Sequence, residues 1–443
     1  MKIQLSSHFT YKTLFYFCIS PIIMMIFTSI YGVVDGFFIS NFVGKVPFAA
    51  VNLVLPFIMI LGSVGFMIGT GGSALIAKTL GEGNQERANH YFTMLIKLTI
   101  ITGILLSLAG IVFMRPISYL LGATDAMIED CVVYGRTLLL FNTAFMLQNV
   151  FQTLLSTAEK PKLGLAITAS AGITNMILDA LFIVVFKWGV AGAALATGIG
   201  ECIGGILPFL YFMRPNSSRL QLKHAKMDAR ILLKACGNGS SELMSNISIS
   251  LISVIYNLQL LKFAGENGVA AYGTIMYVQF IFIAIFIGYT IGTAPVISYH
   301  YGAGNHKELK NLLRKSLLIV IAAGIAMMGI AWALAGPLAR IFVGYDVELF
   351  ALTKHAFRMF AFSFILAGAN IFCSSFFTAL NNGAVSAAIS FLRTLGFQVI
   401  SVLALPVFLG LDGIWYSITV AEVLAFAVSC IFLMANRRKY HYA

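Results

Sequence analysis

The chain alternates between long apolar segments and short polar segments along almost its whole length. Apolar runs of about twenty residues or more, the length that an α-helix needs to cross a bilayer, recur from Phe9 to Met434. Gly, Pro and charged residues separate the runs and indicate loops. The pattern predicts twelve membrane-spanning helices. They cover residues 10–40, 46–78, 88–114, 127–157, 161–186, 189–213, 231–263, 268–301, 308–335, 348–380, 384–408 and 411–435.

The two halves of this pattern resemble each other at a constant offset of 221 residues. The matches include Gly, Pro, Asn and Glu, which a shared apolar composition would not produce. The matched pairs are Gly44 with Gly265, Gly71 with Gly292, Gly81 with Gly302, Asn84 with Asn305, Pro116 with Pro337 and Glu201 with Glu422. We therefore expect an N-lobe over residues 1–213, a cytoplasmic linker over 214–230 and a C-lobe over 231–443. The predicted fold class is an all-α integral membrane protein with two six-helix lobes related by pseudo-two-fold symmetry, an architecture typical of transporters.

Composition supports a membrane protein. Of 443 residues, 59% are hydrophobic and only 10% are charged, whereas soluble domains carry about 25% charged residues. The net charge of +12 does not indicate nucleic acid binding, because most basic residues lie in loops on one side of the predicted helices. We therefore predict a multi-pass protein of the cell inner (cytoplasmic) membrane, in contact with lipid and with both termini in the cytoplasm.

Several classes of function lack their sequence signals. The chain has no G-x-x-x-x-G-K-[ST] phosphate loop and no soluble segment long enough to bind a nucleotide, so we expect no use of ATP. It also has no G-x-S-x-G or H-E-x-x-H motif of hydrolytic enzymes. We therefore expect a protein that is not an enzyme, has no cofactor and acts as a monomer.

Carboxylates inside the predicted helices are the strongest functional candidates. Burying one costs about 3 kcal/mol or more unless it is paired, hydrated or protonated. The five that remain after loop residues are set aside are Asp35, Asp179, Glu201, Glu242 and Glu422. Asn175 lies one helical turn before Asp179, and Thr197 and Asp35 would add oxygens from neighbouring helices. Such a cluster suits a proton or a hard cation such as sodium.

The internal repeat distinguishes two kinds of buried carboxylate. At the offset of 221, the positions of Asp35, Asn175, Asp179 and Thr197 are taken in the second half by Tyr256, Gly396, Ile400 and Ile418. A structural role would be expected in both halves, as it is for Glu201 and Glu422. We therefore interpret Asp35 and Asp179 as functional and the pair Glu201 and Glu422 as structural.

Further polar residues suggest the wall of a substrate cavity. Glu242 lies inside the seventh predicted helix, where the first half has Pro21, and it either lines the cavity or is a hydrogen-bonded packing residue. Gln148, Asn149 and Gln152 form a polar face on the fourth helix. They either line the cavity or make hydrogen bonds between helices.

The sequence resembles the multidrug and toxic compound extrusion (MATE) family, in particular its MepA-like and DinF-like branch. The resemblance rests on Pro21, on the run Tyr-Gly-Val-Val-Asp-Gly-Phe-Phe-Ile-Ser at residues 31–40, and on a Gly-x-Gly-Asn loop in each half. It also rests on Asn175, Asp179 and Thr197. It implies a secondary active multidrug efflux transporter that exchanges hydrophobic or cationic organic compounds for H⁺ or Na⁺ by alternating access.

The resemblance also implies roles for particular residues. The coupling cation would bind at Asp35, Asn175, Asp179 and Thr197, which would be the metal ligands if the ion is Na⁺. The substrate cavity would include Tyr31 with Gln148, Asn149, Gln152 and Glu242, and the first helix would bend at Pro21. An acidic residue that the other bacterial branch carries in the tenth helix is absent here, and the nearest polar residue is Asn370.

One alternative remains from the same superfamily. A flippase for a lipid-linked saccharide would be expected to hold its pyrophosphate with basic residues in a central cavity. The intramembrane charges considered above are acidic, which favours small organic cations and drugs as substrates.

Overall fold

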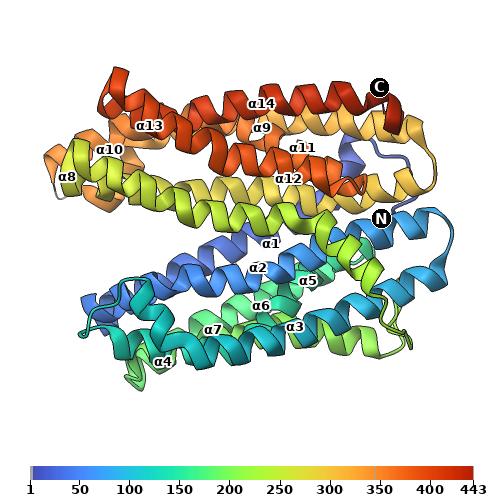
Figure 1. Cartoon of the computed structure of the whole chain (residues 1–443), viewed down its shortest axis with the longest axis horizontal. Helices are drawn as coiled ribbons and strands as arrows, with labels where there is room; N and C mark the ends of the chain where they lie inside the picture. Colours follow the sequence, from blue (N-terminus) through green and yellow to red (C-terminus); the bar gives the residue numbers. More distant parts are fainter. Residues whose placement is uncertain (1–2, 345, 443) are drawn as a thin grey trace.

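The computed structural model describes residues 3–344 and 346–442, where all regular structure is helical. Residues 1 and 2 of the predicted N-lobe and 345 and 443 of the predicted C-lobe lie outside the described residues. The helices form two bundles side by side (Figure 1). The first contains α1 (Tyr11–Phe38), α2 (Lys45–Gly81), α3 (Gln85–Leu120), α4 (Ile128–Leu139), α5 (Asn142–Thr157), α6 (Pro161–Asp179) and α7 (Gly189–Met213). The second contains α8 (Ala229–Gly302), α9 (His306–Val343), α10 (Val347–Phe360), α11 (Phe364–Ala379), α12 (Gly383–Phe391), α13 (Phe397–Leu409) and α14 (Leu411–Tyr440).

The predicted spans all correspond to helices in the described part of the chain. Ten helical stretches are long and apolar enough to cross a membrane, and α4 and α5 form an eleventh span that is bent by 54°. The 74-residue α8 contains two spans, because Gly265 has φ 61° and ψ −150° and breaks the helix there. Gly tolerates this conformation at no steric cost. The fold is therefore the predicted twelve-helix bundle.

The Gly-x-Gly-Asn loops end one helix and start the next in the same way in both lobes. Gly83 and Gly304 adopt positive φ values of 81° and 66°. The side chains of Asn84 and Asn305 then accept hydrogen bonds from backbone amides in the first turn of α3 and of α9, at 3.0 and 3.1 Å. Such a cap satisfies a donor that the helix itself leaves free. The repeated motif is thus explained by a repeated turn.

The lobes meet where α8 crosses α1 and α2. Gly71 of α2 lies against Gly239 of α8, and neither position has room for a Cβ atom. The equivalent contact occurs between Gly292 of α8 and Cys18 of α1, again without space for a side chain on the glycine. Because residues 71 and 292 differ by the repeat offset, the interface includes the same kind of close helix crossing twice.

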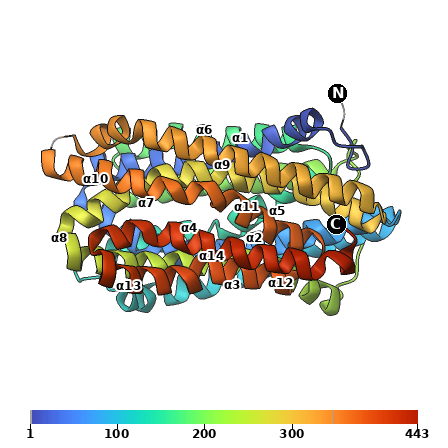
Figure 2. The same cartoon turned by 90° about the horizontal axis from the view of Figure 1, so that it is seen from above.

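The first and last described residues lie at the same end of the molecule (Figures 1 and 2). There the N-terminal segment connects the two lobes. The Leu5 amide donates to Glu159 after α5 at 2.8 Å, and the Phe9 amide donates to Glu308 at the start of α9 at 2.9 Å. Both apolar side chains are fully buried. Residues 3–10 therefore attach to both lobes at this end.

The polar segment between α7 and α8 is non-helical as far as Asp228. It runs along α3, since the amides of Gln221 and Lys223 donate to the side chains of Asn89 and Thr93, both at 3.0 Å. Leu220 is fully buried beside them. This segment is therefore packed on the first lobe.

Candidate functional site

Three helices of the first lobe bring the four predicted cation-site residues together. The Asn175 side chain of α6 donates to the Thr197 hydroxyl of α7 at 3.3 Å. The Asp35 carboxyl of α1 lies close enough to Asp179 and Thr197 to interact with both. Asp179 is fully buried and Asn175 is 2% exposed. Gly200 on α7 allows the helix to approach Asn175 closely.

Four oxygen atoms of this cluster lack hydrogen-bond donors. Both carboxylate oxygens of Asp179, Oδ1 of Asp35 and Oδ1 of Asn175 are buried with no hydrogen-bond partner. Leaving a buried polar atom unpaired costs about 1–3 kcal/mol, and more for a charged one. No positively charged side chain among the described residues pairs with either Asp. The site is therefore suited to receive a proton or a small cation.

A conventional transition-metal site is a poor fit here. Within residues 3–344 and 346–442, no three His, Cys, Asp or Glu side chains are grouped to hold a metal ion. The oxygens available are carboxylate, amide and hydroxyl oxygens, which hard ions such as Na⁺ prefer to soft ligands. The donor set is compatible with the predicted sodium ligands and equally with a proton.

Wider helical turns adjoin both aspartates. Asp179 is the last residue of α6, and the π-helical segment Ala180–Val185 follows it directly. Asp35 lies in the last turn of α1, which the π-helical segment Ile39–Val43 follows. Such turns are frequent at functional sites because they shift side chains out of the regular helical register. The local backbone thus departs from ideal geometry next to both carboxylates.

The predicted cavity residues of the first lobe fall into different surroundings. Tyr31 of α1 and Gln148 of α5 interact through their side chains beside the aspartate cluster. Asn149 donates to the Gly62 carbonyl of α2 at 3.2 Å, which is the interhelical hydrogen bond considered as its alternative role. Gln152 is buried, and its Oε1 atom has no hydrogen-bond partner. Tyr31, which lies within range of the charge of Asp35, therefore adjoins the cation-site residues together with Gln148.

Glu242 lies at the junction of the lobes. It follows Gly239 by one turn of α8, beside the crossing with α2, and it is half-buried. No hydrogen bond or ion pair to its carboxylate occurs in the described part of the chain. At the equivalent position Pro21 lies within α1, which is helical on both sides of it, and contacts Gly288 of α8. Both residues thus lie at lobe contacts.

The second lobe carries a buried ion pair that the analysis of the sequence missed. Arg393 binds Glu422 with nitrogen-to-oxygen distances of 2.9 to 3.0 Å. Asn370 donates to the same carboxylate at 2.7 Å, and Ser429 donates to Asn370. The available signal was an arginine inside the predicted helix 384–408 whose repeat partner, Gly172, has no side chain. The carboxylate of Glu422 is therefore neutralised within the protein.

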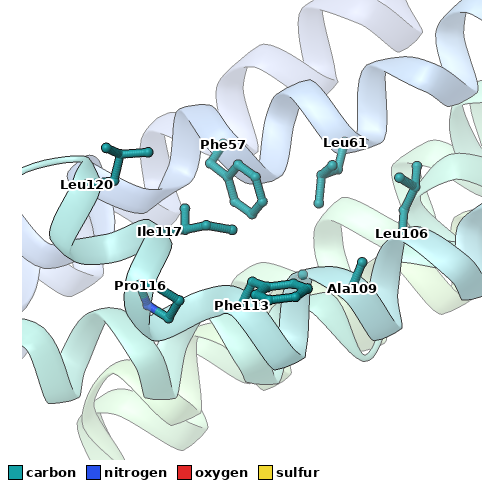
Figure 3. A pocket seen from close by; sticks show the side chains of 9 residues that line it. Phe57, Leu61, Leu106, Ala109, Phe113, Pro116, Ile117 and Leu120 are labelled. Carbon is teal, nitrogen blue, oxygen red and sulfur yellow. The ribbon is translucent and has the colours of Figure 1, made fainter.

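A groove between α2 and α3 does not belong to this site. It has a volume of about 330 Å³ and is lined only by apolar residues and a glycine, among them Phe57, Leu61, Phe113 and Pro116 (Figure 3). None of the predicted site residues lines it. Since Phe113 is well exposed and the lining offers no polar group, the groove faces the hydrocarbon side of the bundle.

A repeated membrane bundle with buried, unpaired carboxylates is typical of a membrane transporter. The chain belongs to the MatE family, whose model matches residues 21–181 in the first lobe and 243–403 in the second. The two matched stretches are offset by 222 residues, within one residue of the internal repeat of 221. The expected MATE resemblance is thus confirmed.

Relatives and solved structures agree with the family. Multidrug export protein MepA of Staphylococcus saprophyticus is 23% identical over 432 residues, covering 96% of this chain and 94% of that protein. MepA of Staphylococcus aureus is 23% identical with the same coverage. A crystal structure of MATE in complex with MaL6 and a structure of a multidrug resistance MATE family transporter in an outward-facing conformation match with TM-scores of 0.93 and 0.92. Both are 21% identical and cover 98% of each chain. They confirm the predicted fold.

Proposed function

We propose that this transporter exports organic cations and other drugs in exchange for H⁺ or Na⁺, which bind at Asp35, Asn175, Asp179 and Thr197. The observation that carries this proposal is the group of buried oxygens without donors on α1, α6 and α7. An intramembrane carboxylate without a partner is a functional candidate by default. The MepA relatives are multidrug export proteins, which supports drug export as the function of this transporter.

The mechanism follows from the electrostatic free energy of the site when no cation is bound. Without a cation, two carboxylates share a site of low dielectric constant, and their charges repel each other. Binding of one cation relieves this repulsion. The cation therefore stabilises the arrangement of the two lobes in which the site binds it most tightly. Drug and cation would then bind in alternation as the lobes open to opposite sides of the membrane. Proline at position 21 of α1 offers a place where the helix can bend.

The unpaired carboxylates inside the membrane favour this function over that of a flippase. Arg393, a largely buried basic side chain of the second lobe, is already paired with Glu422 and is not free to hold a pyrophosphate. The unpaired carboxylates attract cations instead. Most basic residues lie in loops on one side of the helices. This distribution supports a location in the inner membrane with both termini in the cytoplasm.

Transport by purified protein tests the proposal. In proteoliposomes, a fluorescent organic cation is expected to accumulate against its gradient when a proton or a sodium gradient is imposed in the opposite direction, and not when both are absent. Imposing the two gradients separately identifies the coupling ion. Uptake that is equal with and without either gradient would contradict coupled exchange, and movement of a lipid-linked saccharide alone would support the flippase.

Glu242 is expected to contribute to substrate binding. Its carboxylate is half-buried and unpaired at the lobe junction, where it would attract a cationic drug. Replacing it with glutamine should weaken binding of a cationic dye by about 5- to 30-fold, corresponding to about 1–2 kcal/mol. Fluorescence titration with a neutral dye is the matched control and should give the same affinity in both proteins. Equal affinity of the two proteins for the cationic dye would remove Glu242 from the substrate site.

A further inference from the structure

Glu201 lies in the first lobe on the same face of α7 as Thr197, one turn away. It is 7% exposed, and its Oε2 atom is buried with no hydrogen-bond partner. No ion pair to it occurs in the described ranges. A carboxylate that serves only packing would be expected to have its oxygens bonded, because an unpaired one destabilises the fold.

The groups around Glu201 are acidic or neutral. Tyr31 and Asp35 on α1 lie within range of its charge. Tyr134 on α4 is buried and lies within range of the charges of Asp35, Asp179 and Glu201 together. On α5, the neutral side chain of Gln148 packs against Gly204, one turn further along α7. Glu201 thus shares an electrostatic environment with the two aspartates.

The second lobe provides an internal comparison. Glu422 occupies the position equivalent to Glu201, but Arg393 and Asn370 bind its carboxylate. The position equivalent to Arg393 is Gly172, where a Cβ atom would collide with the rings of Phe27 and Tyr31. A guanidinium group cannot enter the first lobe by this route. The same glutamate is therefore neutralised by an arginine in one lobe and left without a positive charge in the other.

We infer that Glu201 binds one of the monovalent cations that drive transport, at a position of its own beside the aspartate pair of the first lobe. This inference rests on the proposed function and deepens it. In the second lobe, the guanidinium of Arg393 permanently occupies the place of such a cation. The two glutamates were expected to share a structural role, and their different partners assign them different ones.

The number of cations exchanged per drug molecule tests the inference. In proteoliposomes, the membrane potential at which net flux of a cationic dye stops gives this number. Glu201→Gln should lower it by one relative to wild type, under whichever of the imposed proton or sodium gradients drives transport. Glu422→Gln is the matched control at the repeat-equivalent position and should leave it unchanged. An unaltered number in Glu201→Gln overturns the inference.

A second measurement applies if Glu201→Gln is inactive or Glu422→Gln folds poorly. Infrared difference spectra of purified protein, recorded on adding the coupling cation, report carboxyl groups that change their bonding. Glu201→Gln should lose one carboxyl component, whereas Glu201→Asp should shift it. Arg393→Gln, which frees Glu422, should gain one. A spectrum of Glu201→Gln that matches wild type contradicts the inference.

These outcomes separate the inference from the proposed function. If Asp35→Asn protein still exports dye like wild type, the proposed cation site is wrong. If Asp35→Asn protein is inactive while Glu201→Gln keeps the wild-type cation number and spectrum, only the role of Glu201 is wrong.

Discussion

Replacing Asp179 with asparagine is expected to reduce drug export by more than about tenfold, since loss of at least 1.4 kcal/mol of coupling free energy removes most of the drive for transport. The asparagine keeps the shape of the side chain but cannot bind a cation through charge or carry a proton. Asp35→Asn should have the same effect, because the two carboxyls lie together at one site. The measurement is the initial rate of dye export from cells or proteoliposomes, normalised to the amount of inserted protein.

The same substitution, Asp179→Asn, should leave the stability of the protein unchanged or increase it. Asp179 is fully buried with both carboxylate oxygens unpaired, so an amide in its place lowers the cost of burial. The thermal unfolding temperature of Asp179→Asn protein in detergent is therefore expected to equal or exceed that of wild type. Glu129→Gln is the control, since Glu129 is an exposed carboxylate paired with Arg115 outside the cluster. Export at the wild-type rate by both aspartate variants would show that the cluster does not couple transport.

Adding a single methyl group at Gly239 is expected to prevent the lobes from closing at the end that holds both termini. No space for a Cβ atom exists there, because the Met67 carbonyl of α2 occupies it. Overpacking of this kind typically costs about 1–3 kcal/mol, and here the cost falls on one arrangement of the lobes only. Gly239→Ala protein should therefore favour the opposite arrangement and export dye several-fold more slowly.

Gly237→Ala is the matched control, since a Cβ atom at Gly237 would meet nothing within 4 Å. Spin labels on Glu86 and Lys307, two exposed residues at equivalent positions of α3 and α9, measure the separation of the lobes. In a cysteine-free background, the distance should lengthen in Gly239→Ala and stay at the wild-type value in Gly237→Ala. A wild-type distance in both proteins would show that the lobes close without this contact.

Twelve spans and their repeat could be predicted because apolar length and Gly, Pro and Asn positions carry that information locally. The bend inside the predicted span 127–157 could not. No Gly or Pro marks the break between α4 and α5. At this break the ring of Phe141 packs against Gly198 of α7, which has no side chain. The pattern of apolar and polar residues along the chain does not reveal tertiary contacts of this kind.

The site was predictable to the extent that charge in an apolar helix is conspicuous. The helix pattern placed four of these polar residues together, and the structure brings them together: Asp35, Asn175, Asp179 and Thr197. Glu201 and Glu422 are the same residue at equivalent repeat positions, and this identity carries no information about the partner of each carboxylate. Only the position of Arg393, in three dimensions, distinguishes them.

The N-terminal segment has a consequence for observing transport. The amide hydrogens of Leu5 and Phe9 are bonded to carboxylates of different lobes, Glu159 and Glu308. Separation of the lobes at this end must break at least one of these bonds and expose that amide to water. Hydrogen–deuterium exchange at residues 5 and 9 therefore reports which side of the membrane the transporter faces, without any label on the protein.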